Sequence, residues 1–257
     1  MVCGTTGEAS TLSYDEHLKA VSFCCEQVNG RIPVISGSGS NDTEHAVLQS
    51  KKCCEIGVDG LLIVTPYYNK TSQSGLVKHY IKIADAVNKP IILYNVPSRT
   101  GMNILPTTCK ELSNHENIVA VKEASGNITQ VAKISELCKN ELWIYSGNDD
   151  QILPILSLGG QGVISVASNI IPIEISAICR LFFENKIEES SSMQIKYLSL
   201  IESLFCDVNP MPIKHALNLI GFNVGPCRLP LTEISEELSK QLSQKLKQHH
   251  LIEADVV

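Results

Sequence analysis

The stretch "NIVAVKE", residues 117–123, decides the fold of this sequence of 257 residues. Four apolar residues follow one another from Ile118 to Val121 without polar alternation, which is typical of a strand buried on both faces of a parallel sheet. The run then ends in two charged residues, Lys122 and Glu123. Because a charge at the end of a buried strand is costly, it indicates either an ion pair or a chemical role.

Other apolar runs of the same kind occur on both sides of this stretch. They are "RIPVIS" from Arg31, "GLLIVTP" from Gly60, "PIILYN" from Pro90, "LWIYSG" from Leu142 and "GVISVAS" from Gly162. The runs start roughly 20 to 30 residues apart, which is the spacing of βα units. With the short "VC" at residues 2–3, we count seven strand signals in all.

Helical patterns fill the gaps between these runs. Ser13 and Glu16 predict a capping box at the start of one helix, Asn41-Asp42-Thr43 can cap the next, and Gly57 ends it. Apolar stripes mark further helices, at Val77, Tyr80, Ala84 and Val87, and at Ile128, Val131, Ile134 and Cys138. Alternating strands and helices predict a parallel sheet. Since the sequence has no dinucleotide-binding fingerprint, we favour a (β/α)8 barrel over an open, doubly wound sheet.

The alternation stops after Ser168. From Ile173 onward the sequence shows only helical patterns, such as "MQIKYLSLIESLF" and "TEISEELSKQLSQKLKQ". We therefore expect a barrel over residues 1–172 and a helical region over residues 173–257.

Composition narrows the choice of partners and compartment. The net charge is −6, and the basic residues are scattered, which argues against nucleic acid or an anionic membrane as partner. No apolar run approaches the roughly 20 residues of a membrane helix, and no signal peptide is apparent, so we expect a cytoplasmic protein. The ten cysteines include no Cys-x-x-Cys pair, and we expect them to be reduced thiols. The histidines lack His-Glu-x-x-His spacing, so no metal site is predicted.

Chemistry-bearing side chains follow the predicted strands, where barrel enzymes carry their catalytic groups. They are Thr5 and Thr6, Tyr67 and Tyr68, Tyr94 and Arg99, Lys122, Asn148 and Asp149, and Ser165. Lys122 is the most informative of them. A desolvated lysine has a lowered pKa, and its neutral amine can form a Schiff base with a carbonyl substrate. The alternative is a structural ion pair between Lys122 and Glu123.

The other candidates also have two interpretations each. Tyr94 either packs only, or donates and accepts protons beside the amine. Arg99 lies in the turn "VPSRTG". It is either a surface residue or a residue whose guanidinium binds a substrate carboxylate. The glycine-rich "ISGSGSND" lacks the ending of a phosphate-binding loop, so we interpret it as a turn with a helix cap.

Together these residues resemble the dihydrodipicolinate synthase family of pyruvate-dependent lyases. The similar stretches are "GTTGEASTLS", "GVDGLLIVTPYYNK", "PIILYNVPSRTG", "VAVKEASG", "GGQGVISVASN" and "VGPCRLPLTEIS". They occur in the family's order and span nearly the whole chain. The resemblance implies condensation of pyruvate with aspartate semialdehyde, in lysine and diaminopimelate biosynthesis. It implies no metal and no organic cofactor.

The resemblance also implies roles for individual residues. Lys122 forms the imine with pyruvate, and Tyr94, Thr6 and Tyr68 relay protons. Tyr68 is supplied across a dimer interface, so the active form is a homo-oligomer, either a dimer or a dimer of dimers. Further residues bind substrate: Thr5 and Thr6 the pyruvate carboxylate, Arg99 the semialdehyde carboxylate, and Gly147 and Ile164 through their carbonyl groups.

Two alternatives stay open. One is N-acetylneuraminate lyase or another pyruvate-dependent aldolase, although Thr5 and Arg99 favour the semialdehyde enzyme. The other is a catalytically weak relic or assembly partner. Relatives carry residues before "GTTGE", so the resemblance leads us to expect that a first βα unit and most of the second strand are missing.

The resemblance extends to an allosteric cleft that binds lysine. Asn41 and Tyr67 match its positions, but His45 stands where lysine-inhibited relatives have a glutamate. Glu44 is adjacent, but neighbouring helical residues point about 100° apart. We therefore expect weak or absent inhibition by lysine.

Overall fold

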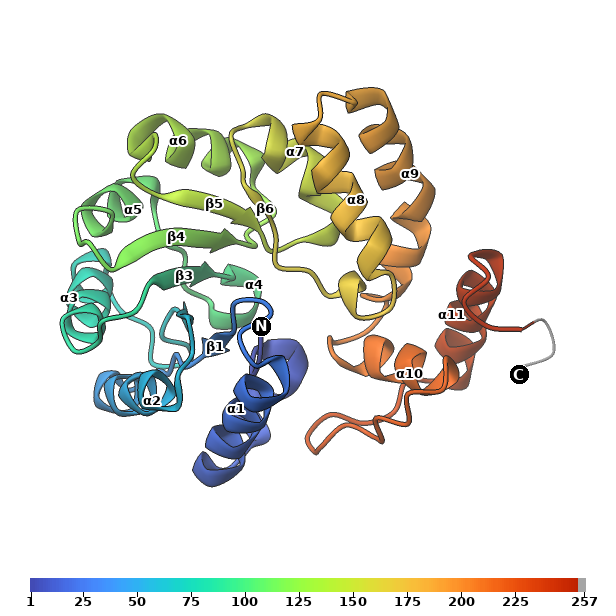
Figure 1. Cartoon of the computed structure of the whole chain (residues 1–257), viewed down its shortest axis with the longest axis horizontal. Coiled ribbons are helices and arrows are strands. Elements are labelled where there is room, and N and C mark those ends of the chain that lie inside the picture. The colour runs from blue at the N-terminus through green and yellow to red at the C-terminus, as the bar shows by residue number, and fades with distance from the viewer. Residues whose placement is uncertain (254–257) are drawn as a thin grey trace. The chain divides into compact units, whose positions relative to one another are not determined.

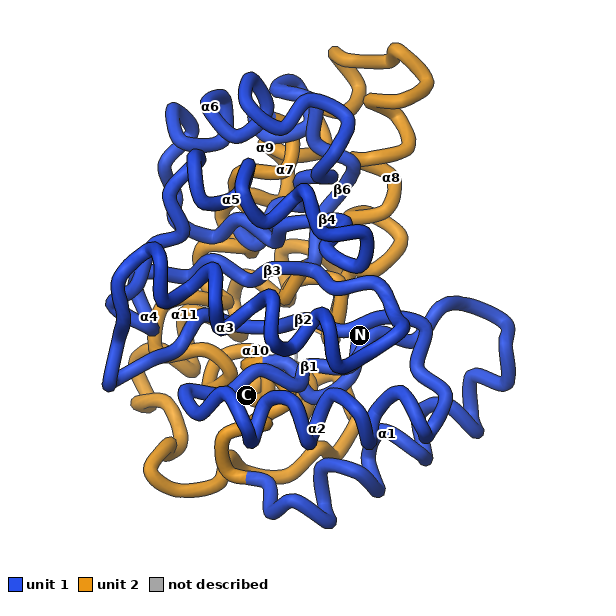
Figure 2. Tube along the Cα trace, turned by 90° about the vertical axis from the view of Figure 1, so that its left-hand side faces the viewer, with its two compact units in different colours: residues 1–4, 12–148, 154–164 blue, residues 5–11, 149–153, 165–257 orange. Residues whose placement is uncertain are grey.

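The structure is a computed structural model, and it describes residues 1–253. The chain divides into two compact units, which Figure 2 shows in different colours. The first unit comprises residues 1–4, 12–148 and 154–164, and the second comprises residues 5–11, 149–153 and 165–257. The last four residues of the predicted helical region, 254–257, lie outside the described part.

The first unit contains a parallel sheet of six strands in chain order (Figure 1). The strands are β1 (Ile35–Gly37), β2 (Gly60–Val64), β3 (Ile91–Asn95), β4 (Ile118–Glu123), β5 (Trp143–Ser146) and β6 (Gly162–Val163). Each lies within a predicted apolar run, except that β1 extends one residue beyond its run, to Gly37. The seventh signal, at residues 2–3, forms an isolated parallel bridge from Val2 to Ser36. In this bridge the Val2 N–H donates to the Ile35 carbonyl at 2.9 Å, and the Gly37 N–H donates to the Val2 carbonyl at 2.9 Å.

The helices of this unit are α1 (Tyr14–Val28), α2 (Thr43–Ile56), α3 (Gln73–Ala84), α4 (Pro97–Thr100), α5 (Pro106–Leu112) and α6 (Ile128–Cys138). Helix α1 precedes β1, and the other helices connect consecutive strands. Helix α7 (Ile152–Ser157) crosses the division between the units. Figure 1 shows α2, α3, α5 and α6 in a row along one face of the sheet, where successive members of the row are in contact.

Local signals explain where several of these helices begin and end. The Ser13–Glu16 capping box forms as predicted, with Ser13 Oγ accepting from Glu16 N–H and Glu16 Oε2 accepting from Ser13 N–H. Asp42 is the N-cap of α2, and Gly57 ends that helix with a φ of 107°, a left-handed conformation that suits glycine. The stripe predicted to reach Val87 was too long, because α3 ends at Ala84. The Asn117 side-chain amide donates to the carbonyls of Ala84 and Val87, which holds the chain in a turn.

The predicted parallel α/β fold with C-terminal helices is confirmed, but barrel closure is not. Among residues 1–253 the strand order runs from β1 to β6 without a pairing between the two ends. An eight-stranded barrel needs each strand to have two neighbours, and β6 pairs only with β5 here. The expected absence of a first βα unit is likewise not confirmed by these residues.

The second unit is helical. Its longer helices are α8 (Pro172–Phe183), α9 (Ile187–Ser203), α10 (Met211–Leu219) and α11 (Glu236–Gln248). Helix α8 packs on α9, and α11 packs on both α9 and α10. The short 3-10 helices η1 (Thr5–Gly7), η2 (Ala9–Thr11), η3 (Asp149–Gln151) and η4 (Ala167–Asn169) also belong to this unit.

All ten cysteines are free thiols, as predicted. Several serve as small apolar core residues, because Cys53, Cys109 and Cys138 are fully buried. Burial raises the pKa of the Cys3 and Cys179 thiols to about 11, so both stay protonated at neutral pH.

Candidate active site

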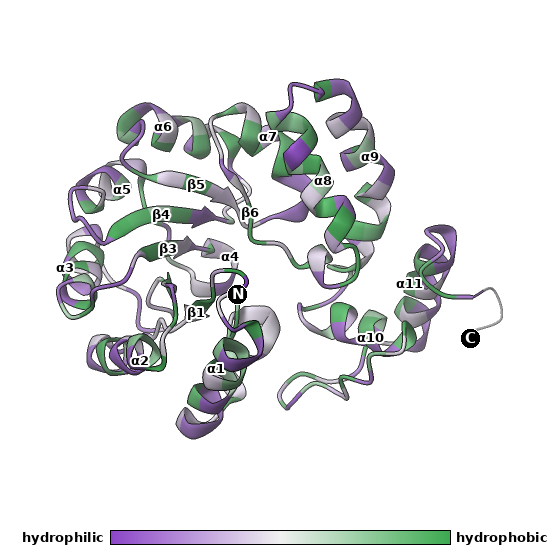
Figure 3. Ribbon diagram, viewed as in Figure 1, coloured by the Kyte–Doolittle hydropathy of each residue, from purple (hydrophilic) through white to green (hydrophobic). Residues whose placement is uncertain are grey.

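Lys122 and Tyr94 lie side by side at the carboxyl ends of two neighbouring strands. The register of β3 and β4 pairs Tyr94 with Lys122, and the Lys122 Nζ lies 4.3 Å from the centre of the Tyr94 ring. Both side chains are only 7% exposed. Figure 3 shows β4 as hydrophobic along most of its length and hydrophilic at its tip. The sheet thus brings an amine and a phenol together in a nearly dry environment.

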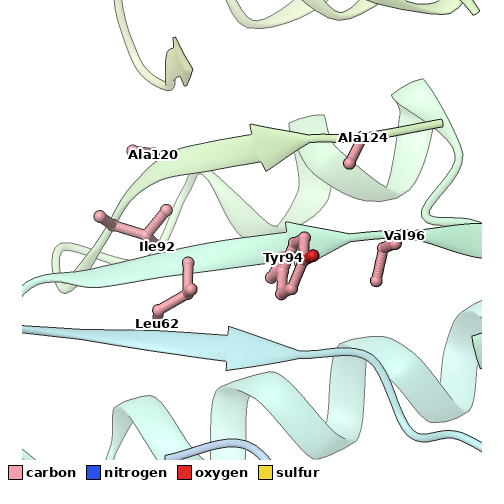
Figure 4. Close-up of a cluster of buried hydrophobic side chains, with 6 residues drawn as sticks. All are labelled: Leu62, Ile92, Tyr94, Val96, Ala120 and Ala124. Carbon is pink, nitrogen blue, oxygen red and sulfur yellow. The ribbon is translucent and has the colours of Figure 1, made fainter. Parts of the chain in front are cut away.

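The surroundings of this pair follow from the alternation of side chains along a strand. Residues two apart point to the same face, so the face that carries Tyr94 and Lys122 also carries their neighbours two positions away. These neighbours form one buried cluster with Tyr94 and with Leu62 of β2 (Figure 4): Ile92, Val96, Ala120 and Ala124. These apolar side chains leave the Lys122 side chain largely shielded from water.

Gly147 and Ile164, two of the predicted substrate-binding residues, lie next to this cluster. The Gly147 N–H donates to the Glu123 carbonyl at 2.8 Å, which fixes the backbone of residue 147 beside the end of β4. A Cβ on Gly147 would stand 3.1 Å from Lys122 Cε and 2.6 Å from Ala124 Cβ. Glycine is therefore required for this close approach. The Ile164 N–H donates to the Ser146 carbonyl, and its side chain packs against the buried cluster.

Glu123 points to the opposite face of the sheet from Lys122. Its carboxylate is 1% exposed, and it accepts hydrogen bonds from Asn95 Nδ2 at 2.9 Å, Gln130 Nε2 at 3.1 Å and the Ser125 N–H at 2.7 Å. Asn103 extends the network by donating to Gln130 Oε1. Glu123 thus has hydrogen-bond partners of its own away from Lys122, which argues against the alternative of a structural Lys122–Glu123 pair. The network ties the end of β3 to the end of β4, one residue beyond Tyr94 and Lys122.

The two tyrosines after β2 are not part of the buried cluster in this chain. Tyr68 is 91% exposed and has a φ of 69°, and Tyr67 is 38% exposed. A bulky residue at positive φ is strained, so neighbouring contacts must hold the loop. One such contact is the hydrogen bond from Asn69 Nδ2 to the Asn41 carbonyl at 2.9 Å.

The side chains of Glu44 and His45 take different directions on α2. Glu44 forms an ion pair with Lys82 of α3. The His45 ring instead lies edge-to-face with the Tyr14 ring of α1, with 6.3 Å between the ring centres. Glu44 therefore does not take the place of the residue at position 45.

Arg99, Thr5 and Thr6 complete the predicted set. Arg99 is exposed on α4, the short helix that directly follows β3. Thr5 and Thr6 form the start of η1 and belong to the second unit. The Thr6 hydroxyl accepts a hydrogen bond from Asn209 Nδ2 at 3.0 Å.

Residues 1–253 show neither a metal cluster nor a membrane-spanning helix. Within residues 1–253, no cluster of three or more His, Cys, Asp or Glu side chains has the arrangement of a metal site. No helix in the same part of the chain is long and apolar enough to span a membrane.

Sequence reasoning missed several residues that contact or adjoin the predicted site residues. Glu123 was considered only as a partner for Lys122, although strand alternation already places consecutive residues on opposite faces. Asn95 could be noticed in the sequence only as a polar residue at the end of an apolar strand. Asn209 gave no signal, because its contact with Thr6 joins positions 203 residues apart.

The chain is thus a parallel α/β protein in which the amine of Lys122 and the phenol of Tyr94 are buried at the carboxyl end of the sheet. Residues 1–249 match the Dihydrodipicolinate synthetase family, and the chain belongs to this family.

Individual relatives are similar over nearly the whole chain. The 4-hydroxy-tetrahydrodipicolinate synthase of Caldicellulosiruptor bescii is 58% identical over 246 residues, which cover 96% of this chain and 83% of that protein. The structure of DHDPS from Cyanidioschyzon merolae with lysine bound is 44% identical, with a TM-score of 0.95, and the match covers 98% of this chain and 86% of that one. The chloride-inhibited dihydrodipicolinate synthase from Acinetobacter baumannii, complexed with pyruvate, is 39% identical with a TM-score of 0.95 and coverages of 97% and 86%.

Proposed function

We propose that this protein is a lyase that condenses pyruvate with aspartate semialdehyde to give 4-hydroxy-tetrahydrodipicolinate, in lysine and diaminopimelate biosynthesis. The observation that carries the proposal is the Lys122 amine, buried 4.3 Å from the Tyr94 ring centre. Family membership supports the same reaction, and it favours neither N-acetylneuraminate lyase nor an inactive relic.

The chemistry starts at the Lys122 nitrogen. The neutral amine attacks the ketone carbon of pyruvate, and the carbinolamine loses water to give an imine. Loss of a methyl proton gives an enamine, whose carbon forms the new C–C bond with the aldehyde carbon of the semialdehyde. The semialdehyde's own amino group then attacks the imine carbon, which closes the ring and releases the Lys122 amine. Lys122 thus returns unchanged at the end of the cycle.

Protons have to move at each of these steps. We assign the relay to the phenol of Tyr94, the hydroxyl of Thr6 and the phenol of Tyr68. Thr5 and Thr6 bind the pyruvate carboxylate through their hydroxyl and N–H groups. The carbonyl groups of Gly147 and Ile164 line the site. This scheme needs no metal or organic cofactor. When the methyl proton leaves, the imine nitrogen takes up the electron pair of the broken C–H bond and so gives the enamine.

The role of Tyr68 requires a second copy of the chain. Tyr68 is 91% exposed, and its φ of 69° strains the backbone. An exposed side chain in a strained conformation fits a residue that enters the active site of a partner subunit. We therefore propose a homo-oligomer, either a dimer or a dimer of dimers, in the cytoplasm. We also assign residues 1–172 to the β/α part of the chain and residues 173–257 to its helical part.

Reductive trapping tests the proposal. Incubation with pyruvate and borohydride should add one pyruvate-derived group to Lys122, because borohydride reduces the imine to a stable amine. Mass spectrometry of the digested protein locates the group. An unmodified chain, or modification of a different lysine, would rule out the assignment.

Replacing Arg99 with alanine should mainly impair use of the semialdehyde. A hydrogen bond to a charged group contributes about 1.5–3 kcal/mol, so kcat/KM for the semialdehyde should fall roughly 10- to 100-fold. Pyruvate trapping at Lys122 should remain. Steady-state assays with each substrate varied in turn measure the two effects, and an equal loss for both substrates would contradict the assignment.

We expect lysine to inhibit this protein weakly or not at all. The relative from Cyanidioschyzon merolae has lysine bound, but here position 45 is an imidazole directed toward Tyr14. An imidazole is a poorer partner than a carboxylate for an ammonium group. Inhibition by sub-millimolar lysine in a steady-state assay would contradict this expectation, and a His45→Glu variant should gain sensitivity.

A further inference from the structure

The segment Thr5–Thr11 carries the two threonines but forms little regular structure of its own. Its internal hydrogen bonds join Glu8 N–H to the Thr5 carbonyl and Thr11 N–H to the Glu8 carbonyl, each at 3.0 Å. Glu8 has a φ of 54°, a left-handed conformation that residues with a Cβ rarely adopt. Such a conformation persists only where contacts from elsewhere hold it.

The contacts that hold Glu8 come from the C-terminal part of the same unit. Glu8 Oε2 accepts from Lys214 Nζ at 2.6 Å, and Glu8 Oε1 accepts from the Arg228 N–H at 2.8 Å. The side chains of Lys214 and Glu8 are only 16% and 13% exposed. Arg228 Nη1 also donates to the Thr11 carbonyl at 3.1 Å. The far end of the segment is therefore fixed at both Glu8 and Thr11.

Asn209 holds the other end of the segment through the Thr6 side chain. Its Nδ2 donates to Thr6 Oγ1 at 3.0 Å, and Asn209 is 7% exposed. The distance from Thr6 Oγ1 to Asn209 Oδ1 is 3.5 Å, beyond the roughly 3.0 Å limit of a good O–H···O bond. The Thr6 hydroxyl is thus mainly an acceptor toward Asn209, and its hydrogen remains available for another acceptor.

We propose that Asn209 and the Glu8–Lys214 pair are positioning residues for Thr5 and Thr6. The ion pair fixes the backbone of the segment, and the Asn209 amide sets the direction of the Thr6 hydroxyl. This inference rests on the proposed function, in which Thr5 and Thr6 bind pyruvate and Thr6 relays protons. None of the three positioning residues touches substrate in this scheme.

The test compares three variants of the full chain. Glu8→Gln removes the charge that Lys214 pairs with, and Asn209→Asp replaces the amide donor by a carboxylate acceptor of the same shape. Glu184→Gln is the matched control, since Glu184 accepts from Arg180 Nη1 and Lys186 Nζ, both at 2.9 Å, in an exposed cluster on α8 and the turn after it. Lys214→Met probes the same pair from its other side if Glu8→Gln does not fold.

Two measurements test whether the Glu8–Lys214 pair fixes the backbone of the segment. Hydrogen exchange of the peptide covering residues 5–11 should speed up in Glu8→Gln and stay unchanged in Glu184→Gln. The kcat/KM for pyruvate should fall about 10-fold or more in Glu8→Gln, because a misplacement of about 1 Å can already lower rates roughly 100-fold. Unchanged exchange and an unchanged kcat/KM would overturn the role of the pair.

Asn209→Asp should leave pyruvate trapping at Lys122 intact under saturating pyruvate. It should slow the exchange of pyruvate methyl hydrogens with D₂O by about 10-fold or more, because a carboxylate accepts the Thr6 hydrogen and removes it from the relay. Methyl exchange at the wild-type rate would overturn the role of Asn209. If wild-type protein is not trapped by pyruvate, the proposed function fails, while the hydrogen-exchange comparison still decides whether the pair positions the segment.

Discussion

Replacing Lys122 with methionine should abolish covalent trapping of pyruvate and lower turnover by roughly 10⁴-fold, since the nucleophile itself is lost. Methionine has a similar length and fits the apolar cluster around position 122. The fold should therefore survive, and thermal unfolding should confirm this. Lys122→Arg keeps a cation in place but cannot form an imine, so it should be as inactive as the methionine variant.

The matched control for this experiment is Lys133→Met. Lys133 lies on α6 in the same unit and is exposed, so its loss removes an amine without touching the buried cluster. Trapping and turnover should both stay at the wild-type level. Substantial turnover in Lys122→Met would show that a different group carries the reaction.

Replacing Tyr94 with phenylalanine should lower turnover by about 100-fold or more. The change removes only the phenol oxygen, and general acid–base groups typically contribute a factor of about 10² to 10⁴. The ring that lies 4.3 Å from Lys122 Nζ stays in place, so the amine keeps its environment. Trapping of pyruvate should therefore still occur at Lys122 but build up more slowly, which a quenched time course measures.

Tyr80→Phe serves as the control for loss of a buried phenol. Tyr80 is fully buried on α3, and its hydroxyl donates to the Ile63 carbonyl at 3.1 Å. Its loss should lower the free energy of unfolding by about 1 kcal/mol and leave turnover within a few-fold of wild type. Equal kinetic losses in the two variants would mean that Tyr94 acts through stability rather than proton transfer.

The sequence predicted the part of the site that depends on strand periodicity. Apolar runs located all six strands, and parallel strands end at the same edge, so Tyr94 and Lys122 could be expected to meet. The last run was predicted too long. "GVISVAS" continues to Ser168, but only Gly162–Val163 pairs in the sheet. The N–H groups of Val166 and Ala167 are bound instead by Asp149 Oδ2, which turns the chain into η4.

The remaining parts of the site could not be predicted, because they depend on contacts between distant residues. Glu8 was visible in "GTTGE" as a carboxylate without a partner, and its partners Lys214 and Arg228 lie more than 200 residues further along the chain. No local pattern marks such a contact. Periodicity therefore identifies the strand ends that carry Tyr94 and Lys122 but not the contacts that hold the loop Thr5–Thr11.

The separation of Thr6 and Asn209 has a consequence for the order in which the protein matures. Each strand of the sheet pairs with the one before it in the chain, so the sheet can grow as synthesis proceeds. The loop around Thr6 cannot, because its partner Asn209 is added 203 residues later. At about 5–20 residues per second, this delay amounts to roughly 10 to 40 seconds on the ribosome. A nascent chain would thus carry Lys122 in its growing sheet well before the loop around Thr6 has been fixed.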